Sequence, residues 1–151
     1  MKIVIGGDHA GYALKEKLKK FLGEKGIQVT DIGTNGLESV DYPDYAEKAA
    51  SLVASGEYTY GILVCGTGNG MAMAANKIPG IRAAVCNDLY SARCSREHND
   101  ANILALGAWI IGCELAKDII NIWLNTQFLG DRHAHRIKKI TNIEKRMKIR
   151  D

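Results

Sequence analysis

Short apolar runs alternate with amphipathic stretches along the chain. Runs rich in β-branched and aliphatic residues lie at 2–6, 27–33, 60–65, 81–86 and 101–107, and glycine or polar residues bound them. This length and composition are typical of buried strands. Between the runs, apolar residues recur at the spacing of an amphipathic helix, as Leu14, Leu18, Phe21 and Leu22 do.

The helical spacing predicts helices over about 14–22, 41–56, 70–77, 89–98 and 113–126. Gly23 and Gly26 end the first, and Pro43 lies near the first turn of the second, where a missing backbone N–H costs little. Near-helical spacing returns towards the end of the chain and predicts a last helix over about 136–149, packed on another surface. The residues that carry it are Ile137, Ile140, Ile143 and Met147.

This regular alternation predicts one α/β domain over residues 1–151, with a five-stranded, mostly parallel sheet covered on both faces. The chain has 151 residues, of which 46% are hydrophobic, and this is enough for a sizeable core. No internal repeat, low-complexity tract or linker interrupts the pattern. In such folds the chemistry lies beyond the carboxyl ends of the strands.

Composition and charge narrow the function classes. The formal net charge of +3 is too small to indicate nucleic-acid binding, although the basic excess near the end favours a local anion site. The N-terminal residues turn polar too quickly for a signal peptide, and no apolar run approaches the ~18 residues of a membrane span. We therefore expect no membrane partner. The four cysteines form no C-x-x-C pair, so we expect free thiols in a reducing cytoplasm.

Reactive side chains follow three of the predicted strands. Asp8 and His9 follow the first, Cys65 ends the third, and Asn87 and Asp88 follow the fourth. Because parallel strands present their carboxyl ends at one edge of a sheet, we expect these groups to gather there.

The glycine-rich loop "GTGNG" after Cys65 has several interpretations. Gly66, Gly68 and Gly70 allow backbone N–H groups to approach an anion or a developing oxyanion. A dinucleotide site would need G-x-G-x-x-G after the first strand, and a P-loop would need G-K-[ST]; the loop fits neither. Cys65 itself is either a base or nucleophile, ionised with help from the following helix, or a small buried hydrophobe.

Further candidates lie later in the chain. His98 is either structural or catalytic, and Cys94, four residues earlier, could begin a zinc site, but no third ligand is evident and no metal is predicted. Arg132 and Arg136 are spaced i, i+4, which suits a phosphate, with a solvated basic face as the alternative. Combined with the thiol and its loop, these residues favour proton transfer next to a carbonyl of a phosphorylated small molecule. A nucleotide-binding module that uses the loop and Asp88 is the competing class.

Six longer motifs occur in order over nearly the whole chain: "GGDHAG" (6–11), "DYPDYA" (41–46), "CGTGNG" (65–70), "ANKIPGIRAAVC" (75–86), "SREHNDANILALG" (95–107) and "RHAHRIKKI" (132–140). They resemble the motifs of the ribose-5-phosphate isomerase type B family. That family also includes galactose-6-phosphate isomerase subunits and enzymes that accept allose 6-phosphate. The resemblance implies a Rossmann-like α/β/α sandwich and interconversion of ribose 5-phosphate and ribulose 5-phosphate through an enediolate. It also implies no metal or organic cofactor.

The resemblance also implies a homodimer with active sites between subunits, and leaves a tetramer open. The last helix would then pack on the partner subunit. Cys65 matches the base that moves a proton between C2 and C1, and His98 matches the ring-opening acid/base, with Thr67 beside it. The matching substrate and phosphate contacts are Asp8, His9, Gly66, Gly68, Asn69, Gly70 and, from the neighbouring subunit, Asn99, Arg132 and Arg136.

Two positions distinguish this chain within the family. Some relatives lack the cysteine and use a glutamate at the position of Asn69; here the cysteine version applies. Many relatives carry an arginine that contacts substrate where this chain has Trp109. An indole cannot make a charge-assisted bond to phosphate, so the preferred sugar phosphate, with five or six carbons, stays open.

Overall fold

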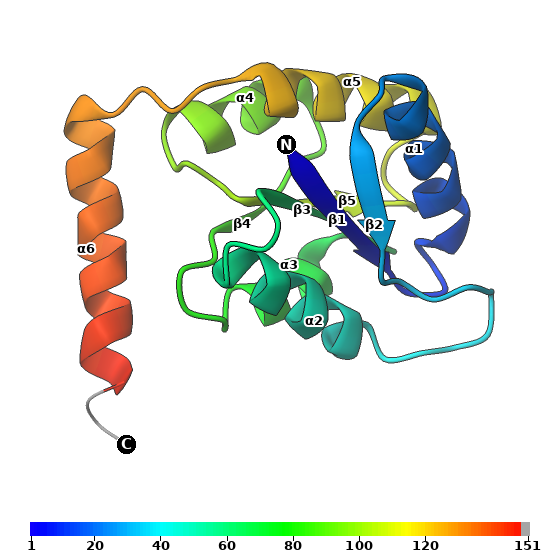
Figure 1. Cartoon of the computed structure of the whole chain (residues 1–151), viewed down its shortest axis with the longest axis horizontal. Coiled ribbons are helices and arrows are strands. Elements are labelled where there is room, and N and C mark those ends of the chain that lie inside the picture. Colours follow the sequence, from blue (N-terminus) through cyan, green and yellow to red (C-terminus); the bar gives the residue numbers. More distant parts are fainter. Residues whose placement is uncertain (149–151) are drawn as a thin grey trace.

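A computed structural model describes residues 1–148, in which strands and helices alternate (Figure 1). The strands are β1 (Lys2–Gly7), β2 (Gln28–Asp31), β3 (Tyr60–Cys65), β4 (Ala83–Val85) and β5 (Ile103–Gly107). The helices are α1 (Tyr12–Glu24), α2 (Tyr42–Ala54), α3 (Asn69–Ala75), α4 (Leu89–Glu97), α5 (Cys113–Asn125) and α6 (Asp131–Lys148).

The five strands form one sheet in the order β2-β1-β3-β5-β4, and all of their pairings are parallel. The predicted α/β fold with a five-stranded parallel sheet is therefore confirmed. After β2 the chain returns to the other side of β1, so the direction of winding reverses between β1 and β3. In open parallel sheets this reversal creates a crevice at the carboxyl ends of the two strands, where ligands bind.

Two apolar layers cover the sheet and make it the middle of a sandwich (Figure 1). Side chains alternate along each strand, as the pleat requires. In β3, Ile62 and Val64 belong to the layer formed with α1, α4 and α5, whereas Leu63 and Cys65 belong to the layer formed with α2 and α3. The sulfur of Cys65 therefore lies on the α2/α3 side of the sheet.

Three strands are shorter than the apolar runs predict. The run at 27–33 gives a strand at Gln28–Asp31, although the Ile32 N–H still donates to the Ile5 carbonyl (2.9 Å). The run at 101–107 gives Ile103–Gly107. The run at 81–86 gives only Ala83–Val85, because the Arg82 N–H is taken by the Asn102 side chain (2.8 Å).

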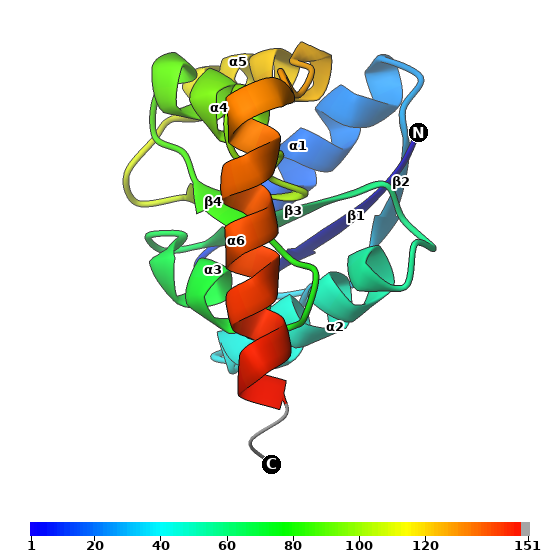
Figure 2. The same cartoon turned by 90° about the vertical axis from the view of Figure 1, so that its left-hand side faces the viewer.

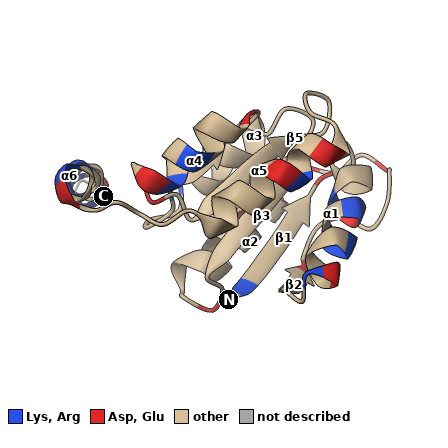
Figure 3. Ribbon diagram, turned by 90° about the horizontal axis from the view of Figure 1, so that it is seen from above, with Lys and Arg blue, Asp and Glu red and all other residues tan. Residues whose placement is uncertain are grey.

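The last helix begins earlier than predicted, at Asp131 instead of about 136. Its first turns are polar and carry no apolar periodicity, which is why the pattern indicated only the later part; the predicted end at 149 lies outside the described residues. An extended connection places α6 beside the β4 edge, apart from the sandwich (Figures 1 and 2). The view from above shows the same separation (Figure 3). Within residues 1–148, no helix combines the length and the apolar character that a membrane crossing requires.

Candidate active site

Cys65 lies at the carboxyl end of β3, where the direction of winding reverses between β1 and β3. It is the last residue of β3, and its side chain is buried, with a relative exposure of 5%. Asp8 follows β1, and its backbone N–H donates to the Val64 carbonyl (3.3 Å), so the first residues after β1 lie against the end of β3. We call Asp8, His9 and residues 65–70 the thiol end.

The glycine loop folds back over the sulfur. The Gly68 N–H donates to Cys65 Sγ (3.1 Å), and Gly68 has φ +81°, a left-handed conformation that suits glycine. Thr67 Oγ1 accepts from the Asn69 N–H (3.3 Å), where α3 begins. The loop thus directs a backbone donor at the thiol, as an oxyanion-binding loop does.

Asp8 and His9 are held by the neighbouring backbone. Asp8 Oδ1 accepts from the Gly11 N–H (3.0 Å), which fixes the turn into α1. His9 Nδ1 accepts from the Val40 N–H (3.2 Å). A neutral imidazole that accepts at Nδ1 carries its proton on Nε2, so His9 offers one donor to a ligand.

Two aromatic rings border the loop. A β-carbon at Gly66 would lie 2.6 Å from ring atoms of Trp109, and one at Gly70 would lie 2.7 Å from the ring of Tyr42. Trp109 also donates its backbone N–H to the Gly66 carbonyl (2.9 Å), yet 74% of the residue is exposed. Trp109 therefore lies directly beside the loop. Sequence reasoning did not single out Tyr42, although its motif "DYPDYA" pointed to the segment.

A second cluster forms where α4 ends and α6 begins. His98 follows the last residue of α4, and its ring stacks on that of His133, with centroids 4.4 Å apart and an interplanar angle of 9°. The Leu129 N–H donates to the Glu97 carbonyl (3.1 Å) and ties the connection before α6 to α4. We call His98, Asn99, Arg132, His133 and Arg136 the histidine end.

Burial lowers the pKa of His133, and the nearby His98, Arg132 and Arg136 lower it further. His133 is the buried ring of the stacked pair, while Arg132 and Arg136 are exposed on α6. Sequence reasoning missed His133. The available signal was helical spacing, since residues 133, 137 and 140 share one face of α6.

The turn after His98 is held by two arginines. Asp100 has φ +44°, an uncommon conformation for a residue with a side chain. Its carboxylate accepts from Arg82 Nη2 (3.1 Å) and Arg96 Nη1 (2.9 Å), and Arg82 Nε also donates to the Asn99 carbonyl (2.9 Å). These bonds fix the direction in which the backbone leaves His98 and Asn99.

Within one chain, the thiol end lies at the carboxyl ends of the strands and the histidine end lies near the start of β5. Cys65 pairs with Gly107 at the carboxyl end of β5, whereas His98 comes just before β5 begins at Ile103. The strand from Ile103 to Gly107 is roughly 13 Å long at the usual rise per residue. The structure therefore brings together the predicted residues of the thiol end, and separately those of the histidine end, but not the two sets.

Asn87 and Asp88 follow β4 at the carboxyl ends of the parallel strands, as predicted. The strand order puts β5 between β3 and β4, so these two residues lie two strands away from Cys65. The Asp88 carboxylate accepts from the Ser91 N–H (2.7 Å) and hydroxyl (2.9 Å), and so caps α4. That capping role accounts for Asp88 without a ligand.

Comparison with known proteins gives the family. The model of the Ribose/Galactose Isomerase family matches residues 3–140. The chain belongs to this family. The predicted resemblance is confirmed, and the predicted enzyme class, a sugar-phosphate isomerase, is confirmed at the level of the family.

Individual relatives cover almost the whole chain. The Escherichia coli protein named ribose-5-phosphate isomerase B is 51% identical over 145 residues, which are 96% of this chain and 97% of that protein. The structure of Clostridium thermocellum ribose-5-phosphate isomerase B matches with a TM-score of 0.96 and 58% identity, covering 97% of this chain and 99% of that one. A Pectobacterium atrosepticum relative named D-erythrulose-4-phosphate isomerase is 45% identical and covers 93% of each chain.

Proposed function

We propose that this protein interconverts D-ribose 5-phosphate and D-ribulose 5-phosphate. The observation that carries the proposal is the Cys65 sulfur, placed where the winding reverses between β1 and β3, with the Gly68 N–H directed at it (3.1 Å). The names of the E. coli and C. thermocellum relatives support the five-carbon substrate.

In the proposed mechanism, Cys65 is the single base of the proton transfer. Its thiolate removes the proton from C2 of the open-chain sugar to give an enediolate, the hydroxyl proton passes from O2 to O1, and the thiol returns its proton to C1. The backbone N–H groups of residues 66–70 stabilise the charge on the enediolate oxygen, and the loss of one such donor typically costs ~2.7–4 kcal/mol of barrier height. The transfer needs no metal or organic cofactor, since one base removes and returns the same proton.

The histidine end supplies the groups for ring opening and phosphate binding. His98 opens the sugar ring as acid and base, and Asn99 contacts the substrate. Thr67, from the thiol end, lies beside the reacting atoms. Arg132 and Arg136 bind the phosphate through charge-assisted hydrogen bonds, which suit forked guanidinium groups. Asp8, His9 and the loop residues Gly66, Gly68, Asn69 and Gly70 hold the sugar at the thiol end.

We propose that the complete site forms between two copies of the chain. The thiol end of one copy would meet the histidine end of the other, because the two ends of a single chain are separated by the length of β5. A homodimer suffices for this arrangement, and a tetramer made of two such dimers is the alternative.

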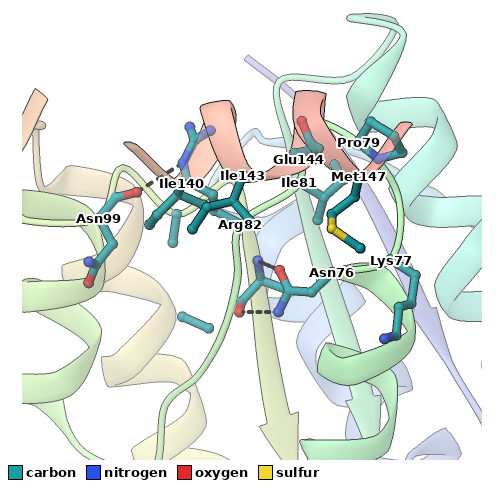
Figure 4. Close-up of a pocket in the computed structure, with 13 residues that line it drawn as sticks. Asn76, Lys77, Pro79, Ile81, Arg82, Asn99, Ile140, Ile143, Glu144 and Met147 are labelled. Carbon is teal, nitrogen blue, oxygen red and sulfur yellow. Dashed lines mark hydrogen bonds between the residues drawn. The ribbon is translucent and has the colours of Figure 1, made fainter. Parts of the chain in front are cut away.

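The surface of α6 supports this pairing. A groove of about 780 Å³ separates α6 from the β4 side of the sandwich, and Ile140, Ile143 and Met147 line it (Figure 4). These three residues are exposed by 50%, 52% and 57%. Such an apolar stripe on a helix outside the sandwich suits burial against a second copy of the chain. We also propose a cytoplasmic location, which agrees with the four free cysteines.

Another sugar phosphate is the second candidate substrate. Trp109 lies beside Gly66, where relatives often carry a substrate-binding arginine, and its indole offers no charge to a phosphate. The relative named for D-erythrulose 4-phosphate indicates that substrates differ within the family. Allose 6-phosphate and galactose 6-phosphate are therefore tested beside the five-carbon sugar.

The decisive experiment measures isomerisation by the purified, metal-free chain and by Cys65→Ala. We expect turnover of ribose 5-phosphate that falls by about 10³-fold in the variant, since a lost base removes both proton transfers. Cys86→Ala is the matched control: it removes another buried thiol, whose pKa burial raises, and we expect it to retain turnover. Full activity in folded Cys65→Ala would refute the role of Cys65 as the base. Turnover only of a six-carbon sugar phosphate would replace the substrate while keeping the mechanism.

A further inference from the structure

Three side chains that can ligate a metal converge at the last turn of α4. One ligand atom from each of Cys94, Glu97 and His98 lies within 4.8 Å of the others. The spacing i, i+3, i+4 places the three residues on one face of the helix. The sequence suggested only the Cys94 and His98 pair; the structure adds Glu97 as the third ligand.

The donor set selects a class of metal. Thiolate, imidazole and carboxylate together suit a borderline-soft divalent ion such as zinc or cobalt, whereas magnesium and calcium prefer oxygen ligands alone. His98 Nε2 and Glu97 Oε2 are 3.9 Å apart. Metal–ligand bonds of about 2.0–2.3 Å need donors only slightly closer than this, so small side-chain rotations suffice. Three protein ligands leave a fourth position open to water.

The surroundings allow access and hold one ligand in place. All three residues are half-buried, so solvent reaches the ligand atoms. Stacking on His133 holds the plane of the His98 ring, with centroids 4.4 Å apart. The carboxyl end of α4 also favours a cation through the helix dipole.

Positive charge opposes the ion at the same place. Arg93 lies 4.0 Å from the Glu97 carboxylate, and Arg132 and Arg136 are near enough to act on His133. These charges limit the affinity, so the ion would be bound reversibly.

We propose that Cys94, Glu97 and His98 form a site for a zinc-class divalent ion, and that its occupation inhibits the isomerase. A bound ion would hold the His98 nitrogen and remove it as acid and base. The inhibition rests on the proposed role of His98, whereas the binding does not depend on the reaction.

Cobalt serves as a spectroscopic probe of binding. Titration of Co²⁺ into the full-length, metal-free protein should give visible d–d bands and a thiolate-to-cobalt charge-transfer band. We expect both in the wild type, in Cys65→Ala and in Cys113→Ser, which replaces another half-buried free cysteine. We expect neither in Cys94→Ser. Absence of the bands from the wild type, their persistence in Cys94→Ser, or their loss in Cys65→Ala would overturn the site.

Zinc inhibition tests the consequence for activity. Added Zn²⁺ should lower wild-type turnover, and a chelator should restore it. In Cys94→Ser and in Glu97→Gln, the zinc concentration for half-inhibition should rise by at least about tenfold, with turnover in the absence of zinc unchanged. Equal zinc sensitivity of Cys94→Ser and the wild type would refute the inhibitory role. A chain that isomerises no sugar phosphate would refute the proposed function, and the cobalt spectra would still decide the site.

Discussion

The thiol end is held by backbone, whereas the histidine end is held by side chains. At the thiol end, strand termini and N–H groups fix Cys65 and Asp8, and both are buried. At the histidine end, a ring stack and the arginine bonds to the Asp100 turn fix His98, while Arg132 and Arg136 stay exposed. A sheet can thus position a side chain within one chain through its backbone, whereas the helix ends leave Arg132 and Arg136 at the surface, where a second chain could reach them.

The largest effect on turnover is expected from two variants that each inactivate one of the two ends. Cys65→Ala and His98→Asn should each be inactive alone, because each removes a group that every site needs. If sites are shared between copies, mixing the two variants under exchange should restore about a quarter of wild-type activity, since half of the dimers then contain one intact site. Turnover of the mixture measures this, and the unmixed variants are the controls. A mixture that stays inactive after proven exchange would contradict the shared site.

The next prediction concerns the exposed arginines. Arg136→Ala should raise KM about tenfold or more while leaving the unfolding midpoint unchanged, because it removes a charge-assisted contact to phosphate and no buried group. Lys138→Ala, on the same helix and equally exposed, is the matched control. Equal KM values for the two variants would assign both residues to a solvated basic face.

A smaller effect should come from the contact between the loop and Trp109. The methyl group of Gly66→Ala would lie 2.6 Å from the indole, so we expect a loss of about 1–3 kcal/mol in the free energy of unfolding. Trp109→Ala should suppress most of this loss in the double variant. Denaturant unfolding of the wild type, the two single variants and the double variant gives the coupling free energy between the two positions. An additive result would mean that the indole moves aside without cost.

The smallest effect is the pH dependence of stability that His133 contributes. Its pKa is lowered in the folded protein, so the unfolded chain takes up a proton at higher pH than the folded chain does. The stability that neutral His133 contributes to the folded protein is fully present above its ordinary pKa of 6.5, and it is lost as the pH falls through the lowered pKa of the folded protein. Unfolding at about pH 7 and about pH 5 should therefore differ less in His133→Asn than in the wild type or in His135→Asn. An unchanged difference in His133→Asn would contradict the prediction.

Much of the fold could be predicted because apolar residues recur at helical spacing in the helices and form short continuous runs in the strands. Alternation of strand and helix also indicates parallel pairing, and glycines mark the loop after Cys65. The strand order could not be read, since it depends on which edges pair. The sequence therefore predicts that Asn87, Asp88 and Cys65 share the carboxyl end of the sheet, but not that β5 lies between their strands.

The histidine end was harder to predict because its residues act across elements. His133 becomes notable only once its ring lies on His98, and Glu97 becomes a candidate ligand only once its carboxylate lies near the His98 ring. Local spacing indicated the arginine pair, but nothing local indicated that the two ends would be separated by the length of β5.

The turn at Asp100 has a consequence for how the protein can evolve. Replacement of Asp100 removes a hydrogen-bond acceptor from the guanidinium groups of Arg82 and Arg96. Replacement of either arginine removes a hydrogen bond that holds the left-handed turn. Single substitutions here are therefore harmful, and a neutral path needs several changes at once. We therefore expect the segment that presents His98 to change more slowly in length and direction than exposed positions such as Trp109.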